Sequence, residues 1–144
     1  MTKTQEETLK SITISQENNP FDFEEREKYC FVAKRKDKIV AFASMVRQEE
    51  FGANWIFRDC QVNPRYRGLG LQRKLIQARI EFAKTVFTPY LDWRHFIAFV
   101  RPKNQYSLNN LISEGFLVFQ DELVKFKGAE HIQMGKTIEV CEKS

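Results

Sequence analysis

The residues best suited to chemistry lie together at positions 63–75, in the segment NPRYRGLGLQRKL. The segment holds two glycines two residues apart and four basic side chains, and it contains no acidic residue. Helix N-termini normally attract acidic side chains, because the helix dipole is positive at that end. A basic helix start whose glycines leave the backbone N–H groups uncovered is suited instead to bind an anion such as pyrophosphate.

Other interpretations of this segment are weaker. The dinucleotide-binding fingerprint requires a third glycine where Arg73 stands, and the nucleotide P-loop ends in Gly-Lys-Ser/Thr, which is absent from the segment. A basic helix that enters a nucleic-acid groove is disfavoured by the broad apolar stripe of residues 70–87 and by the central glycines. A tight turn with solvated basic side chains is the structural alternative.

The segment resembles the coenzyme A signature of the GNAT N-acetyltransferase superfamily. That signature is Arg/Gln-x-x-Gly-x-Gly/Ala after a strand that ends in Val-x-Pro, and Arg65, Gly68 and Gly70 stand at its defined positions. Residues 100–116, VRPKNQYSLNNLISEGF, are similar to the later Val-x-x-x-Asn helix of the family, which ends in Gly-Phe. With two motifs in the family's order, the resemblance covers roughly residues 29–126.

The resemblance implies acetyl-CoA as the acyl donor substrate, and it implies no metal. The pyrophosphate would be held by the backbone and the arginines of the glycine turn, and the pantetheine arm would lie between the splayed strands 54–62 and 96–100. Asn104 would contact that arm, cap the helix that follows it, or do both. The implied cofactor-binding residues are Cys60, Val62, Arg65, Arg67, Gly68, Leu69, Gly70, Leu71 and Asn104.

The implied reaction is direct transfer of an acetyl group to a primary amine in a ternary complex, and it needs a base. An amine with a pKa near 10.4 is almost fully protonated at neutral pH, so a proton must be removed before attack. Asp59, on the strand nearest the implied thioester, is our first candidate for this base because strands of this family often carry an acid at or beside this position. A buried acid that bonds backbone is the structural alternative. Glu49, Glu50 and His95 are the alternatives.

The departing thiolate raises a second proton question. Many family members place a tyrosine seven residues after the helix asparagine, and this chain has Leu111 there. Ser107 shares a helix face with Asn104 and is the candidate to relay a proton through water, whereas Tyr106 is expected to point elsewhere. A missing general acid lowers a rate by roughly 10²–10⁴. A coenzyme A-binding module with little or no catalysis is therefore the alternative to an enzyme.

Hydrophobic periodicity predicts the elements that position these residues. Strands are expected at 11–15, 29–35, 39–47, 54–62, 96–100, 116–126 and 132–140, helices at 18–27, 70–87 and 104–114, and disorder at 1–8. This order is typical of an α/β domain. The resemblance implies a GNAT-like mixed, mostly antiparallel central sheet flanked by helices, with a shortened N-terminal helical region. Residues 1–144 are expected to form a single domain.

Composition limits the partners and the location. The net charge of +4 is too small to imply nucleic acid, and the sequence has neither a signal peptide nor an apolar run of membrane-spanning length. Three cysteines without metal-like spacing (Cys30, Cys60 and Cys141) are expected to be reduced thiols in a cytoplasmic protein. The acceptor is expected to be a small-molecule or peptide amine. The acidic residues 21–27 are best placed to meet a cationic amine, but a solvated helix with Phe21 or Phe23 as core anchors is the favoured alternative for them. The sequence leaves a homodimer open.

Overall fold

The computed structural model describes residues 1–17, 28–47, 54–86 and 93–140. In chain order the elements are α1 (Lys3–Lys10), β1 (Ile12–Glu17), β2 (Lys28–Arg35), β3 (Lys38–Arg47), β4 (Asn54–Val62), a 3₁₀ turn (Pro64–Tyr66), α2 (Leu71–Thr85), β5 (Trp93–Val100), α3 (Gln105–Ser113), β6 (Leu117–Val118), β7 (Val124–Phe126) and β8 (Ala129–Glu139).

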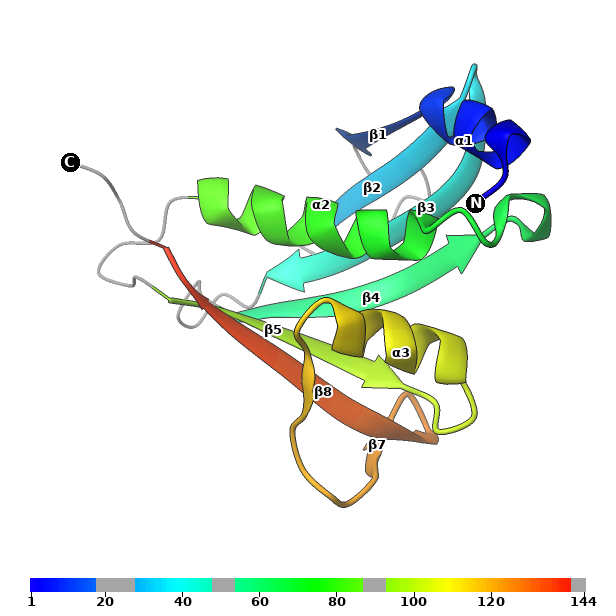
Figure 1. Cartoon of the computed structure of the whole chain (residues 1–144). Coiled ribbons are helices and arrows are strands. Elements are labelled where there is room, and N and C mark those ends of the chain that lie inside the picture. Colours follow the sequence, from blue (N-terminus) through cyan, green and yellow to red (C-terminus); the bar gives the residue numbers. More distant parts are fainter. Residues whose placement is uncertain (18–27, 48–53, 87–92, 141–144) are drawn as a thin grey trace.

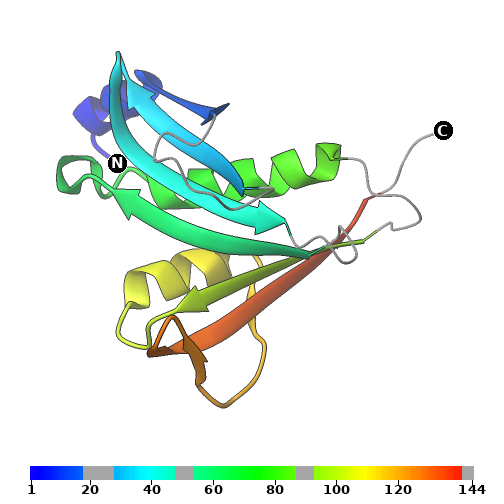
Figure 2. The same cartoon turned by 180° about the vertical axis from the view of Figure 1, so that it is seen from behind.

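The strands form one mixed, mostly antiparallel sheet, as expected. Their order is β1-β2-β3-β4-β5-β8-β6, and β7 pairs with β8 beside this path. The contact between β4 and β5 is parallel, and all the others are antiparallel. Helices α2 and α3 lie on the same face of the sheet, α2 over β2–β4 and α3 beside β5 where β4 and β5 separate (Figures 1 and 2).

The sheet opens between β4 and β5. These strands pair at only three positions, Asn54 with His95, Trp55 with Phe96, and Ile56 with Ile97. Beyond Ile56 they diverge, and Figure 1 shows the gap widening toward the end of β4. In the described part of the chain, no other strand pairs with this stretch of β4 on the side that faces β5. Its backbone groups on that side are therefore available to a ligand.

A β-bulge interrupts β4 next to this opening. Ala43 of β3 pairs with Cys60, but the next residue, Ser44, pairs with Arg58, which leaves Asp59 as an extra residue on β4. A bulge of this kind re-aims the side chains beside it and increases the local twist of the strand. The divergence of β4 and β5 that we expected is therefore accompanied by a β-bulge at Asp59, the candidate base.

Helix α2 is anchored by the apolar stripe that the sequence predicted. Its buried apolar residues are Leu71, Leu75, Ile76, Ile80 and Ala83. Phe82 adds ring contacts with Tyr29, Phe31 and Trp55 of the sheet, at centroid distances of 4.8, 5.6 and 6.4 Å. At the C-terminal end of the helix, the buried Arg94 donates from Nε to the Ala83 carbonyl (3.2 Å) and from Nη2 to the Val86 carbonyl (3.0 Å). The last carbonyls of a helix lack i→i+4 partners, and these bonds serve two carbonyls at this end, of which Ala83 also accepts the Val86 N–H at 3.4 Å.

Helix α3 begins and ends where the sequence indicated. The Asn104 side chain accepts a hydrogen bond from the Ser107 backbone N–H at 3.1 Å, which makes Asn104 the N-cap. At the other end Gly115 has a φ of +92°, and the N–H groups of Gly115 and Phe116 donate to the Ile112 and Leu111 carbonyls. This is a Schellman motif, which requires the left-handed glycine at that place.

Two expectations about the elements were wrong. Residues 1–8 are not disordered throughout, because α1 occupies 3–10 and starts with a capping box: Gln5 N–H donates to Thr2 Oγ1, and Thr2 N–H donates to Gln5 Oε1. The single strand expected at 116–126 is two short strands, β6 and β7, with irregular backbone between them. The helix expected at 18–27, and with it the length of the N-terminal helical region, lies outside the described residues. No helix in the described ranges is long and apolar enough to cross a membrane.

Candidate active site

The glycine turn presents open backbone N–H groups. Gly68 and Gly70 have φ values of +82° and +76°, which side-chain-bearing residues rarely adopt, and a Cβ atom on either would meet nothing within 4 Å. Gly70 is the N-cap of α2 and supplies no side-chain cap. The first N–H groups of a helix have no intrahelical partner, and the space beside the two glycines is open, which together is an arrangement that binds phosphate groups. Leu69 and Leu71 are buried and anchor the turn from below.

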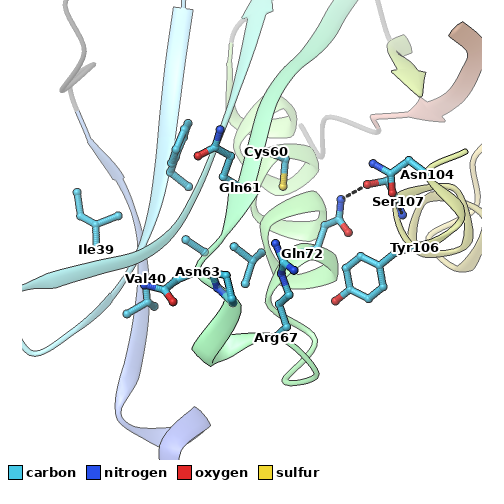
Figure 3. A pocket seen from close by; sticks show the side chains of 14 residues that line it. Ile39, Val40, Cys60, Gln61, Asn63, Arg67, Gln72, Asn104, Tyr106 and Ser107 are labelled. Atoms are coloured by element: carbon cyan, nitrogen blue, oxygen red, sulfur yellow. Dashed lines mark hydrogen bonds between the residues drawn. The ribbon is translucent and has the colours of Figure 1, made fainter. Parts of the chain in front are cut away.

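A groove of about 970 Å³ begins beside this turn. It runs between the start of β3, the end of β4 and the N-terminal ends of α2 and α3 (Figure 3). Its lining residues are Ile39, Val40, Ala41, Phe42, Cys60, Gln61, Val62, Asn63, Pro64, Arg67, Gln72, Asn104, Tyr106 and Ser107. Of the predicted cofactor-binding residues, the groove brings together Cys60, Val62, Arg67 and Asn104. Arg65, Gly68, Leu69, Gly70 and Leu71 belong to the adjacent turn and do not line the groove.

A second cavity, of about 410 Å³, lies in the opening between β4 and β5. Ile76, Arg79 and Leu111 line it from the helix side. On the other side of the sheet, Phe99 of β5 stacks on Phe126 of β7 with a centroid distance of 4.2 Å, and both line the cavity. The cavity therefore reaches through the sheet. It shares Cys60, Gln72, Asn104 and Ser107 with the groove, so the two spaces meet at these residues.

Gln72 fixes this junction, and our sequence reasoning missed it. Its Nε2 donates to Ser107 Oγ at 2.8 Å, and its Oε1 accepts from Asn110 Nδ2 at 2.7 Å (Figure 3 shows the first bond). The side chain is only 8% exposed, so these bonds hold α2 and α3 together away from solvent. The only signal in the sequence was a polar residue at the second position of an apolar helix face.

The two predicted catalytic residues occupy different walls. Ser107 lies at the junction, where its hydroxyl accepts the bond from Gln72 and keeps its own O–H to donate. Asp59 lies on the β4 bulge and lines the second cavity only. A carboxylate oxygen of Asp59 is 3.5 Å from Nζ of Lys28, and 38% of the Asp59 side chain is exposed. Asp59 is therefore a partly exposed carboxylate in the wall of this cavity.

The other predicted proton carriers are not at the junction. His95 pairs with Asn54 at the closed end of the strand pair and contacts Thr137 Oγ1 at 2.8 Å, and it lines neither cavity. Glu49 and Glu50 lie outside the described residues. Leu111 is buried and gives the cavity an apolar wall at the position where the family resemblance leads one to expect a tyrosine.

Tyr106 corrects an expectation. It does not point away from the site but lines the groove beside Arg67 and Gln72 (Figure 3). The prediction counted 100° per residue from Asn104, but Asn104 is a cap with non-helical backbone angles (φ −87°, ψ 72°). The helical count therefore does not apply across that residue.

Two arginines of α2 differ in their surroundings. Arg73 forms an ion pair with Glu114 at 2.7 Å, which ties α2 to the end of α3. Arg79 is 2% exposed, and burial lowers the pKa of its guanidinium to about 10. Burial likewise raises the pKa of the Cys60 thiol, an effect that the charge of Arg79 and a hydrogen bond from Gln72 oppose. Near neutral pH the guanidinium is therefore charged and the thiol is neutral.

Residues 3–109 match the model of the acetyltransferase (GNAT) family. The chain belongs to this family. It is accordingly a GNAT-type acyltransferase, of a family whose donor is acetyl-CoA, and it has the mixed sheet of the GNAT fold. No curated protein matches the sequence significantly.

Solved structures agree in fold. The ribosomal-protein-S18-alanine N-acetyltransferase from Escherichia coli aligns with a TM-score of 0.64 and 16% identity, over 92% of this chain and 96% of that one. A GNAT acetyltransferase from Elizabethkingia anophelis with acetyl-CoA bound aligns with a TM-score of 0.63 and 15% identity, over 90% and 98%. A mutant of spermidine N-acetyltransferase from Vibrio cholerae gives 0.60 and 13%, over 79% and 66%. At these identities the likeness concerns the fold.

Proposed function

We propose that this GNAT protein moves an acetyl group from acetyl-CoA to a primary amine by direct attack in a ternary complex. The observation that carries the proposal is the meeting of two cavities at Cys60, Gln72, Asn104 and Ser107. One cavity leads from the glycine turn, and the other leads through the sheet to its opposite face. A donor in the first and an acceptor in the second would place the thioester and the amine together.

The donor would occupy the groove with its pyrophosphate at the glycine turn. Backbone N–H groups of residues 67–71 and the Arg65 and Arg67 side chains would bind the phosphates. The pantetheine arm would then run along the open edge of β4, where backbone groups near Cys60 and Val62 bond its amides and polarise the thioester carbonyl. The capping oxygen of Asn104 is engaged with Ser107, but its amide NH₂ still has hydrogens to donate.

The acceptor would enter the second cavity, with Asp59 as the base. The spermidine and the ribosomal-protein alanine named for two structures of this fold are both primary amines, one small and one peptidic. We propose an acceptor of one of these two classes, which would enter the cavity past the stacked rings of Phe99 and Phe126. Ser107 would supply a proton through water. The free thiols of Cys30 and Cys60 favour a reducing cytoplasmic location.

Binding of the donor is the first test. Isothermal titration calorimetry with acetyl-CoA, coenzyme A and ATP should show micromolar binding of the first two and clearly weaker binding of ATP. Thiol release over a panel of polyamines, amino acids and N-terminal peptides then tests turnover. Failure to bind acetyl-CoA would refute the proposal, and sedimentation velocity during the same work would decide whether a homodimer forms.

Leu111 favours a second candidate, a coenzyme A-binding protein with little catalysis. Its apolar side chain offers no proton to a departing thiolate. Leu111→Tyr would place an acid in the cavity wall and should raise turnover of a weak enzyme, by at most roughly 10²–10⁴. Unchanged, negligible turnover in both forms, with acetyl-CoA bound, would support the binding protein instead.

A further inference from the structure

Arg79 is a buried cation that the described residues do not neutralise. Nε donates to the Leu75 carbonyl at 3.1 Å, Nη1 donates to the Ser44 carbonyl at 3.2 Å, and the guanidinium carbon lies 3.8 Å from the centre of the Phe57 ring. Within the described ranges, no carboxylate pairs with it and Nη2 makes no hydrogen bond. A guanidinium removed from water in this way is unfavourable for stability.

Arg94 shows what a structural arginine looks like in the same fold. It is as deeply buried as Arg79, and each of its three guanidinium nitrogens donates to a backbone carbonyl, those of Ala83, Trp93 and Val86. Arg94 lines neither cavity, whereas Arg79 lines the second one. Arg94 donates to carbonyls at the C-terminal end of α2. Arg79, by contrast, lines a cavity and has N–H groups on Nη2 that make no hydrogen bond to the described residues.

The place of Arg79 within the cavity is specific. It lies close enough to Cys60, one of the residues at the junction, for the two to influence each other electrostatically. The apolar Leu111 lines the same cavity. The junction therefore has a fixed positive charge at hand and an apolar wall beside it. A charge as deeply buried as that of Arg79 acts more strongly than one in solvent.

We propose that Arg79 is a catalytic residue that stabilises negative charge on the coenzyme A sulfur as it departs. The inference rests on the proposed function. The amine lone pair forms the C–N bond, the carbonyl oxygen carries the negative charge briefly, and collapse breaks the C–S bond with its electron pair on sulfur. The amine proton goes to Asp59 or water. The products are the amide, a thiolate beside the guanidinium, and one proton.

Arg79 acts here through its charge and not as an acid. A guanidinium does not give up its proton at neutral pH, so the thiolate leaves as an anion and takes its proton later, through the water that Ser107 would relay. This would allow thiolate departure in a site whose wall at Leu111 offers no hydroxyl. Such a role would also explain why a buried charge that is unfavourable for stability is present on the sheet-facing side of α2.

The test is the acidity of the coenzyme A thiol when bound. Thiolate absorbance in the ultraviolet is followed against pH for the complex, and the complex with desulfo-coenzyme A, which has no thiol, is subtracted to remove signals from protein groups. The bound thiol pKa should lie about 1–3 units below the ordinary value of about 8.5, as an adjacent opposite charge produces. Arg79→Met should return it toward that value, while Arg79→Lys, which keeps the charge, should remain lower.

A control variant and the other charged groups make the result specific. Arg73→Met removes a charge from the same helix outside both cavities and should leave the thiol pKa unchanged. The remaining ionisable groups of the cavity (Arg58, Asp59, Cys60, Arg101, Lys127 and His131) are present in every variant, so the difference between wild type and Arg79→Met isolates Arg79. Arg79→Gln serves as the neutral variant if Arg79→Met does not fold.

The outcomes separate this inference from the proposed function. Equal thiol pKa values in wild type and the neutral variant, with coenzyme A bound to both, would overturn the role of Arg79 and leave the acetyltransferase proposal standing. A wild-type protein that binds neither coenzyme A nor desulfo-coenzyme A would overturn both. A thiol pKa that rises only in the neutral Arg79 variants would support the proposal.

Discussion

Gln72 offers the sharpest prediction for the architecture of the site. Gln72→Met keeps the length of a buried side chain but removes the bonds to Ser107 Oγ (2.8 Å) and from Asn110 Nδ2 (2.7 Å). Each neutral hydrogen bond contributes about 0.5–1.5 kcal/mol to stability, so the pair predicts a loss of about 1–3 kcal/mol in the free energy of unfolding. For a chain of this size the melting temperature should fall by about 2–12 °C.

The assay is thermal unfolding with and without saturating acetyl-CoA, with Gln77→Met as the matched control. Gln77 is on the same helix and bonds Glu114 at 3.2 Å, but it is exposed, so its loss should change the melting temperature little. Gln72→Met should also reduce the stabilisation that acetyl-CoA provides, because Gln72 and Ser107 form the junction. Equal melting temperatures for the two variants would refute the claim that Gln72 clamps α2 to α3.

Three further predictions concern the turn and the base. Arg67→Ala should weaken acetyl-CoA binding about 10–150-fold by calorimetry, which is the contribution of a charge-assisted hydrogen bond. Arg65→Ala should weaken binding less, because Arg65 does not line the groove. A larger loss of affinity in Arg65→Ala than in Arg67→Ala would place the phosphates on the other side of the turn. Gly70→Ala should lower stability by about 1–2 kcal/mol, since an alanine at a φ of +76° is strained, as denaturant unfolding would measure, and an unchanged midpoint would contradict this. Asp59→Asn should lower kcat by roughly 10²–10⁴ with little change in the KM for acetyl-CoA, and a wild-type kcat would remove Asp59 from the base role.

Much of the fold was predictable because local patterns and the fold agree. The bounds of β4 (Asn54–Val62) match the strand predicted at 54–62, and the glycine after α3 adopts the left-handed conformation that its motif requires. Helix α1 was missed because its start depends on a reciprocal Thr2–Gln5 cap within a polar segment that composition alone marks as disordered. The split of 116–126 into β6 and β7 depends on which strand pairs with β8, and periodicity carries no such information.

The candidate site was predictable only where a motif marked it. The glycine turn and Asn104 belong to motifs with a defined spacing in the sequence. In the structure, Asn104 lines the groove and the glycine turn lies next to it. Gln72 and Arg79 have no motif, because their importance comes from what lies opposite them: Ser107 and Asn110 on another helix in one case, and a cavity wall in the other. In the sequence, Arg79 is one basic residue among several in and before the helix predicted at 70–87.

The site exists because sheet pairing fails at one place, and that failure explains which residue types surround it. Where β4 diverges from β5, its backbone groups lose their strand partners, and a bulge at Asp59 turns the strand. Side chains that would be part of a packed core elsewhere line a cavity here. Polar and charged groups are tolerated in such a gap only if other protein groups or a ligand satisfy them. Gln72 is satisfied by α3, and Arg94 by the end of α2. Arg79 is a buried arginine with an N–H group, on Nη2, that makes no hydrogen bond to the described residues. It lies where the coenzyme A thiolate would form.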